Sequence, residues 1–286
     1  DSTFILSLKK PFSPLLSMLT MAYCYVVPRE AVEYYDKEFG THPVGTGPFQ
    51  FANWEPGVKL NLVKNHSYFL PTKGNLDAIS ISFMQSKQTE LLEFIQGNLD
   101  IFTGIESSFK DEILTADGLL NDKYAGSITL QKFPFLNTEY LAFNLELSNS
   151  PISDVNFRKA IHHAIDRKSM VKYLRNGVGI PANGGFVPHG LPSHVSYQSD
   201  GYDPKLARQF LSESNIVQTT PLKLTTTSDY LDLCILVQKN CSEIGISIDL
   251  DVVPSSLLKQ QKSAGELAFF RSSWIADYPD GENYMA

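Results

Sequence analysis

The chain has 286 residues, 43% of them hydrophobic and 12% aromatic, which is enough for one large domain or two of medium size. Its 31 acidic residues outnumber its 24 lysines and arginines, so the formal net charge is -7. This balance argues against a nucleic-acid or anionic-membrane surface, because both require clustered basic residues.

The N-terminal residues DSTFILSLKKPF are too short and too weakly patterned for a signal peptide, and no run reaches the length of a transmembrane helix. Their apolar side chains predict a strand that begins at once, as expected of a chain cut from a longer one. The spacing of apolar residues then predicts a short helix over 11–21 and a second helix over 29–39, which ends at Gly40.

The three cysteines give no disulfide framework. Cys234 and Cys241 lie on one predicted helix, about 10 Å apart along its axis, which is beyond disulfide reach. Cys24 lies in an apolar run. We therefore expect buried free thiols.

A GTG turn at residues 45–47 leads into a predicted β-hairpin. Apolar and polar residues alternate from Phe49 and again from Val58, and the turn sequence EPG separates the two runs. A phosphate-binding loop would have to lead into a helix N-terminus, so no nucleotide site is predicted at this turn.

The middle of the chain mixes strands with one short helix. Strands are predicted over 79–83, 99–105 and 128–133, and a helix over 89–97 that ends at Gly97. In the next strand Tyr140, Ala142 and Asn144 share one face, while the residues between them share the other. A domain boundary is predicted at 134–137.

The second half of the chain predicts an α/β layer. Asp154 is a good N-cap for a long helix over 155–176 that Gly177 ends, and Asp203 followed by Pro204 begins another helix. A strand over 222–226, a helix over 229–244, a strand over 246–252, a helix over 255–263 and a final strand follow. This βαβαβ order predicts a largely parallel sheet.

The final strand, LAFF at 267–270, is expected to break directly into a turn-rich segment. Arg271, Trp274, Asp277 and Tyr278 follow at this break. A cation, two aromatic rings and a carboxylate there suit a charged, partly apolar small molecule, since open α/β sheets bind ligands beyond the carboxyl ends of their strands. The aromatic rings favour an ammonium-bearing ligand over a simple surface ion pair between Arg271 and Asp277.

No metal site, cofactor or catalytic group is predicted. His162 and His163 are adjacent and therefore about 100° apart on a helix, so they cannot share one ion as an i, i+4 pair can. The chain has no GxSxG elbow and no cysteine in a histidine-associated context. Asp277 and Asp280 lie in one Pro/Gly turn, where we expect one to face the cleft and the other to cap the turn.

Three segments together resemble one family. They are GTGPFQFANWEPGVKLNLVKNHSYF, YLAFNLELSNSPISDVNFRKAIHHAIDRKSMVKYLRNGVGIPANGGFVP and WIADYPDGENYM. Their order and spacing resemble those of the family 5 extracellular solute-binding proteins, which are the dipeptide, oligopeptide and nickel receptors of ABC importers. The similarity covers nearly the whole chain.

This resemblance implies an α/β type II periplasmic-binding-protein fold, in which two lobes close over a ligand. Residues 1–135 would form part of lobe I, and residues 136–286 would form part of lobe III, incomplete at its C-terminal end. Family chains are considerably longer, so the resemblance also implies that this chain is an internal fragment.

The resemblance also implies roles for individual residues. Asp277 matches the aspartate that receives the α-ammonium of a bound peptide, and Arg271 matches an arginine that contacts the peptide or its waters. Trp274 lines the pocket in this comparison. Tyr140, Phe143 and Asn144 lie on the strand that faces the ligand at the lobe boundary, although a longer NLELSNSP stretch follows this strand here.

The implied protein is a binding protein and not an enzyme. It would capture small peptides between its lobes and deliver them to an ABC permease, working as a monomer in the periplasm or as a membrane-anchored extracytoplasmic lipoprotein. The same fold binds oligosaccharides, nickel chelates or haem in relatives, and Asp277 favours an ammonium ligand among these. A hydrolase or peptidase is the alternative from a different class, and it would alter the ligand.

Overall fold

The computed structural model describes residues 3–71, 74–106, 108–133, 135–147, 150–183, 185–191, 193–195 and 201–285. The chain divides into two compact units, Asp1–Gly104 and Ile105–Ala286. Residues 105–133, which lie before the boundary expected at 134–137, therefore belong to the second compact unit. The division of the whole receptor into lobes at 135 and 136 stays a prediction.

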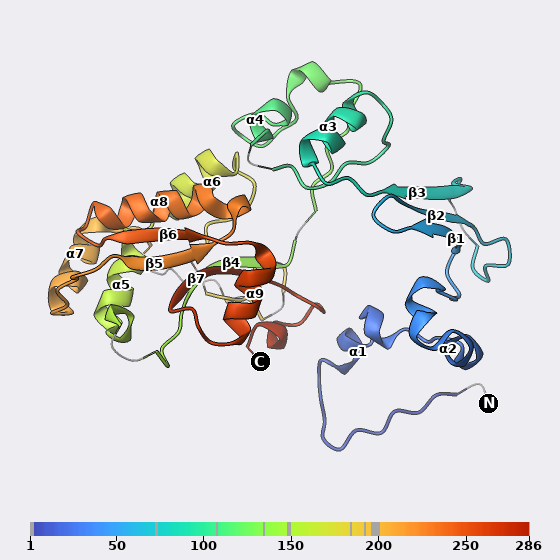
Figure 1. Cartoon of the computed structure of the whole chain (residues 1–286), viewed down its shortest axis with the longest axis horizontal. Helices are drawn as coiled ribbons and strands as arrows, with labels where there is room; N and C mark the ends of the chain where they lie inside the picture. The colour runs from blue at the N-terminus through green and yellow to red at the C-terminus, as the bar shows by residue number, and fades with distance from the viewer. Residues whose placement is uncertain are drawn as a thin grey trace. The chain divides into compact units, whose positions relative to one another are not determined.

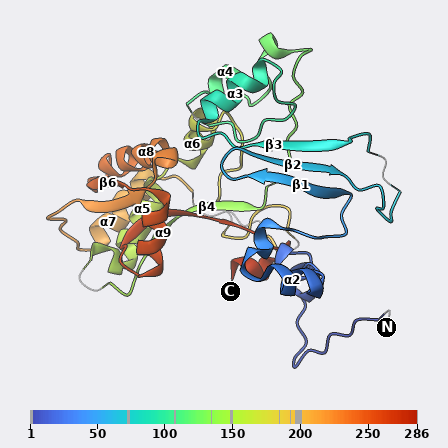
Figure 2. The same ribbon diagram turned by 45° about the vertical axis from the view of Figure 1, so that its right-hand side comes forward.

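The first unit contains a three-stranded antiparallel sheet, which Figure 2 shows in the order β1-β2-β3. Its strands are β1 (Phe49–Glu55), β2 (Lys59–Lys64) and β3 (Ala78–Ser82). Gly57, in the turn between β1 and β2, has φ +74°, which glycine adopts without the strain of a side chain. The predicted hairpin and the strand at 79–83 are therefore confirmed.

The first two helices of the first unit are shorter than predicted, and the third is shifted along the chain. They are α1 (Leu15–Met18), α2 (Arg29–Tyr35) and α3 (Lys87–Ile95). Helix α2 stops before Asp36, whose φ of +46° cannot continue an α-helix, and a 3-10 segment follows. Helix α3 begins two residues earlier than predicted, because the Ser86 hydroxyl accepts a hydrogen bond from the Thr89 amide at 3.3 Å.

Three predicted strands are wrong. Residues 4–8 form no strand, and neither do residues 99–105 or 128–133. Strands need a partner edge, and alternation alone does not supply one. Cys24 is exposed, contrary to the expectation of three buried thiols, while Cys234 and Cys241 are buried and all three are free.

The second unit is built on a four-stranded sheet in the order β4-β7-β5-β6. Its strands are β4 (Asn137–Phe143), β5 (Leu222–Thr226), β6 (Ile248–Val252) and β7 (Phe269–Ile275). Strand β5 is parallel to both β6 and β7, and β4 is antiparallel to β7. The predicted α/β layer with a largely parallel sheet is confirmed.

The helices of this unit are α4 (Lys110–Ile113), α5 (Val155–Ala164), α6 (Arg167–Leu174), α7 (Pro204–Glu213), α8 (Leu231–Ser242) and α9 (Ser255–Ser263). Figure 1 shows α8 above strands β5 and β6, and α9 on the lower side of the sheet near β4 and β7. The single helix expected over 155–176 is wrong: it breaks at Ile165, which is extended. Asp166 then accepts a hydrogen bond from the Ser169 amide at 3.0 Å and so caps α6.

The core of the second unit joins helices α5 and α8 to the sheet. Phe157 of α5, Leu224 of β5, Cys241 of α8 and Phe269 of β7 are fully buried there. Burial raises the pKa of the Cys241 thiol to about 12. This packed layer fixes the carboxyl ends of β5 and β7 in space.

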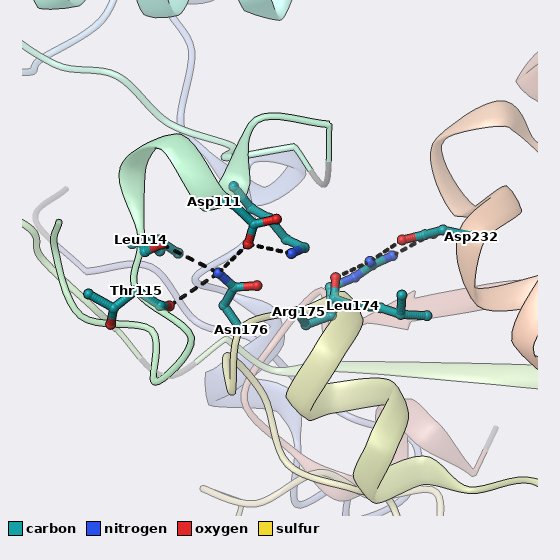
Figure 3. Close-up of polar contacts among 8 residues, drawn as sticks. Asp111, Leu114, Thr115, Leu174, Arg175, Asn176 and Asp232 are labelled. Carbon is teal, nitrogen blue, oxygen red and sulfur yellow. Dashed lines mark hydrogen bonds and ion pairs between the residues drawn. The ribbon is translucent and has the colours of Figure 1, made fainter.

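Asn176, which follows α6, connects α4 and the residues just after it to the end of α6 within the second unit (Figure 3). Its side-chain amide donates hydrogen bonds to Asp111 at 2.9 Å and to the carbonyl oxygens of Thr115 at 3.1 Å and Leu114 at 3.5 Å. Asn176 is 2% exposed, so these acceptors lie around a buried amide. The neighbouring Arg175 is paired with Asp232 of α8 at 2.7 Å.

Candidate functional site

Strand β7 is longer than expected, and its length separates two of the predicted site residues. It continues to Ile275, so Arg271 and Trp274 both lie within the strand and not in a turn after it. Side chains alternate along a strand, and these two residues therefore point to opposite faces of the sheet. The expectation that the strand breaks at Phe270 is wrong.

Arg271 is held on the face of the sheet that α8 covers. It is 8% exposed and forms an ion pair with Glu139 of β4. Its Cζ lies 3.0 Å from the centroid of the Tyr230 ring, which immediately precedes α8. The buried Nε has no hydrogen-bond partner among the described residues. Arg271 is thus enclosed by protein groups and barely reaches solvent.

The turn after β7 is organised by Asn283. Its side-chain oxygen accepts one hydrogen bond from the Trp274 indole at 2.9 Å and another from the Asp277 amide at 3.1 Å. Trp274 is 40% exposed, and the side chain of Asp277 is exposed. One acceptor therefore sets the indole and the backbone of Asp277 relative to each other.

One carboxylate of this turn caps it, as expected, while the expectation that the other faces a cleft stays a prediction. Asp280 caps the 3-10 segment Gly281–Tyr284 by accepting a hydrogen bond from the Glu282 amide at 2.9 Å. Asp277 makes no side-chain hydrogen bond or ion pair with the described part of the chain. Asp277 is accordingly the carboxylate that stays open.

Tyr278 does not line an open surface. It is 8% exposed, and its hydroxyl donates a hydrogen bond to Glu282. This bond to a carboxylate raises the pKa of Tyr278 above its ordinary value. Tyr278 braces the turn from inside, so its expected role as a ligand contact stays a prediction that its present position does not favour.

Tyr140 lies on the same face of the sheet as Trp274, because its partner in β7 is Ser272. Its ring packs edge-on against Phe186 at 5.0 Å, and Phe186 in turn packs against Tyr284 at 5.7 Å. Thr138 binds the Phe186 carbonyl at 2.9 Å. These contacts join β4, the segment around Phe186 and the C-terminal turn.

Phe143 and Asn144 lie at the other end of β4. Phe143 stacks on Phe269 with centroids 4.7 Å apart, and Asn144 donates to the Gly265 carbonyl at 2.9 Å. Because β4 is antiparallel to β7, this end is about 20 Å along the strand from Ile275. The structure does not bring these two residues together with Asp277, and their role toward a ligand stays a prediction.

Three residues of this region were not singled out from the sequence: Asn283, Glu139 and Tyr230. Asn283 stands beside the Asp280 cap in the segment DGENY, and an amide within a capped turn is the only local signal for it. Glu139 and Tyr230 are distant from Arg271 in sequence. Only the pairing of β4 with β7 and the start of α8 bring them to it.

The described ranges contain no group of three or more histidine, cysteine, aspartate or glutamate side chains placed to hold a metal ion. His162 and His163 have rings at 89° to each other, and Nδ1 of His163 lies 2.9 Å from the Gly201 carbonyl. Among the helices that the structure describes, none is both long and apolar enough to cross a bilayer.

Comparison with known proteins gives one family match over the whole chain. The model of the bacterial extracellular solute-binding proteins, family 5 middle, matches residues 1–286. Glutathione-binding protein GsiB of Escherichia coli O1:K1 / APEC is 27% identical over 284 residues, which are 96% of this chain and 53% of that protein. The chain thus spans about half the length of the curated relatives it matches.

Solved structures share the fold. DppA from Helicobacter pylori in complex with the peptide STSA has a TM-score of 0.75 at 23% identity, over 97% of this chain and 53% of that one. NikA from Brucella suis in complex with Fe(III)-EDTA has a TM-score of 0.69 at 20% identity, over 81% of this chain and 48% of that one. The α/β type II periplasmic-binding-protein fold expected for this chain is therefore confirmed.

Proposed function

Because the chain belongs to the family 5 bacterial extracellular solute-binding proteins, we propose that it is part of a receptor that captures small peptides for an ABC importer. The receptor binds its ligand without altering it and delivers it to a membrane permease. It acts as a monomer in the periplasm, or at the outer face of the membrane through a lipid anchor.

The observation that carries this proposal is the open carboxylate of Asp277 beside a fixed aromatic ring. Asn283 holds the indole of Trp274 and the backbone of Asp277 together. The carboxylate itself is exposed and has no partner within the described residues. A carboxylate whose backbone is fixed in advance binds a cation without first losing an internal partner.

The free amino terminus of a peptide fits this pair of groups. Its ammonium pairs with the Asp277 carboxylate through charge-assisted hydrogen bonds, and the ring of Trp274 attracts the same positive charge. The cost of removing both charges from water is offset only when the ligand is present, so ligand and carboxylate stabilise each other. Backbone groups of the flanking strands would pair with the extended peptide.

Glutathione and peptides appear in the names of several relatives, among them GsiB and DppA. Those ligands are compatible with an ammonium site at Asp277, and they support peptides over the other ligands of this fold. NikA from Brucella suis was solved in complex with Fe(III)-EDTA. A metal chelate is therefore the ligand to test if no peptide binds.

The test is calorimetric titration of the full-length protein with a mixture of short peptides and with the same mixture N-acetylated. We expect the first mixture to bind, the second to bind far more weakly, and mass spectrometry to recover every peptide unaltered. If neither mixture binds, the ligand class is instead an oligosaccharide, a nickel chelate or haem. Cleaved peptides would overturn the binding role in favour of a hydrolase.

A further inference from the structure

The arginine at the middle of β7 is neutralised before any ligand arrives. Arg271 is enclosed by Glu139 on one side and Tyr230 on another. We propose that Glu139 is a specificity-determining residue: by cancelling the charge of Arg271 it makes this side of the sheet indifferent to ligand carboxylates. The inference rests on the proposed function, because it concerns which peptides the receptor prefers.

Strand pairing places the two charges together. Arg271 of β7 lies opposite Leu141 of β4, and Glu139 is the next residue of β4 on the same face. Their ion pair therefore follows from the register of two strands and does not depend on a flexible loop. Tyr230 covers the guanidinium from the start of α8.

Glu139 is committed through both of its oxygens. One accepts from Arg271, and the other accepts from the side-chain amide of Asn137 at 2.8 Å. Asn137 is on the same face of β4, so the carboxylate is oriented along the strand toward Arg271. A carboxylate held at both oxygens has no freedom to turn away from the arginine.

Exposure decides which of the two charges a ligand meets. The side chain of Glu139 is 38% exposed and that of Arg271 is 10% exposed. An anionic group approaching from solvent thus meets the glutamate of a neutral ion pair and finds no net positive charge. It would have to displace Glu139 to reach the arginine, so it gains no net charge pairing.

Arg271 nevertheless retains unused binding capacity. Its Nε is buried and has no partner among the described residues. An arginine offers five donors, and a carboxylate binds it through a planar fork. If the negative charge at residue 139 is removed, the guanidinium becomes a site for the carboxyl terminus or an acidic side chain of a peptide.

The experiment compares the free acids and the C-terminal amides of alanine peptides of two, three and four residues, which place the terminal carboxylate at different distances. Calorimetry with the full-length protein gives the acid-to-amide affinity ratio for each length. The proteins are the wild type, Glu139→Gln, Arg271→Gln and the double variant. Glu146→Gln is the control, because it removes an exposed carboxylate just after β4.

We expect Glu139→Gln to raise the acid-to-amide ratio about tenfold or more for at least one length, since a charge-assisted hydrogen bond is worth about that factor. Arg271→Gln should lower the ratio, because it leaves Glu139 unpaired and repulsive. The double variant should return to the wild-type ratio, and Glu146→Gln should not depart from it.

An unchanged ratio in Glu139→Gln at all three lengths, with wild-type peptide binding intact, would overturn this inference and leave the proposed function standing. Failure of the wild type to bind any of the peptides would overturn the proposed function and this inference with it. Glu139→Ser provides a second variant if the glutamine disturbs folding, as judged by circular dichroism. Glu139→Ser must also raise the acid-to-amide affinity ratio.

Discussion

Two asparagines organise polar contacts in the second unit, and they do so in opposite ways. Asn176 donates from a buried amide to two backbone carbonyls and to Asp111, an exposed carboxylate that is also paired with Lys110 (Figure 3). Asn283 accepts from Trp274 and from the backbone of Asp277, and the carboxylate of Asp277 remains exposed. We call the first network closed, because its carboxylate is paired, and the second open, because the Asp277 carboxylate has no partner among the described residues.

This difference separates a structural contact from a candidate binding contact. Polar groups that satisfy each other internally stabilise the fold, and their loss leaves donors or acceptors unpaired. A charged group that is fixed through its backbone and free at its side chain contributes little to folding. Its chemistry is available to a ligand, which is the physical basis for assigning the site to the turn after β7.

The largest expected effect is at the closed network. We predict that Asn176→Ala lowers the free energy of unfolding by about 2–4 kcal/mol, because it removes the amide donor and places alanine at a positive φ. That φ is +48° in this structure. Denaturant unfolding of the full-length protein measures the loss.

Asn176→Gly is the matched control, since glycine adopts a positive φ freely and loses only the hydrogen bonds. We expect it to be less destabilising than Asn176→Ala by about 1 kcal/mol. Equal stability of wild type and Asn176→Ala would contradict the structural role given to this amide.

The open network should give a smaller change in stability and a local change in Trp274. We predict that Asn283→Ala costs about 1–2 kcal/mol and frees the indole to move. Among the 286 residues Trp54 is the only other tryptophan, so in a Trp54→Phe background the fluorescence that Trp274→Phe removes reports this indole. In that background, Asn283→Ala should increase the quenching of Trp274 fluorescence by acrylamide.

Asn283→Asp keeps an acceptor oxygen and should restore much of the protection from quenching. If acrylamide quenches the Trp274 fluorescence of Asn283→Ala no more strongly than that of the Trp54→Phe protein, Asn283 does not hold the indole in solution.

The smallest expected effect concerns the hydrogen bond between Tyr278 and Glu282 in the turn after β7. Glu282 raises the pKa of Tyr278 above 10.0, so Glu282→Gln should bring that pKa back toward its ordinary value. Tyrosinate absorbance is read directly after a pH jump. The part of this absorbance that is lost in Tyr278→Phe reports the titration of Tyr278 alone. A pKa that does not fall in Glu282→Gln would show that the bond is not formed.

The sign of the pH effect follows from the direction of this shift. A pKa that is raised in the folded protein means that folding favours the protonated phenol. The stability from this bond is therefore fully present below the ordinary pKa and is lost as the pH rises through the raised value.

Local signals predicted much of the second unit. The caps at Asp154 and Asp203 depend on one side chain and the amides that follow it, and both were predicted correctly. Strand β5 and helix α9 have the predicted bounds, because turn residues flank each apolar pattern. Such features are decided within a few residues and so can be read from sequence.

Other features depend on partners far along the chain. The break between α5 and α6 had a local signal in Asp166, but the continuous apolar stripe outweighed it. The true length of β7 is set by pairing with β4, which extends the strand past Phe270 and turns Arg271 and Trp274 to different faces. Sequence patterns therefore predicted the residue types of the site but not which of them share a surface.

The most direct test of the central claim is the affinity of the full-length protein for trialanine and N-acetyl-trialanine, in wild type, Asp277→Asn and the control Asp249→Asn, an exposed aspartate on β6. We expect wild type and control to prefer the free amine about thirtyfold or more, as a desolvated charge pair provides. Asp277→Asn should bind both peptides alike. A preference that survives in Asp277→Asn would contradict the assignment of the ammonium site to this carboxylate.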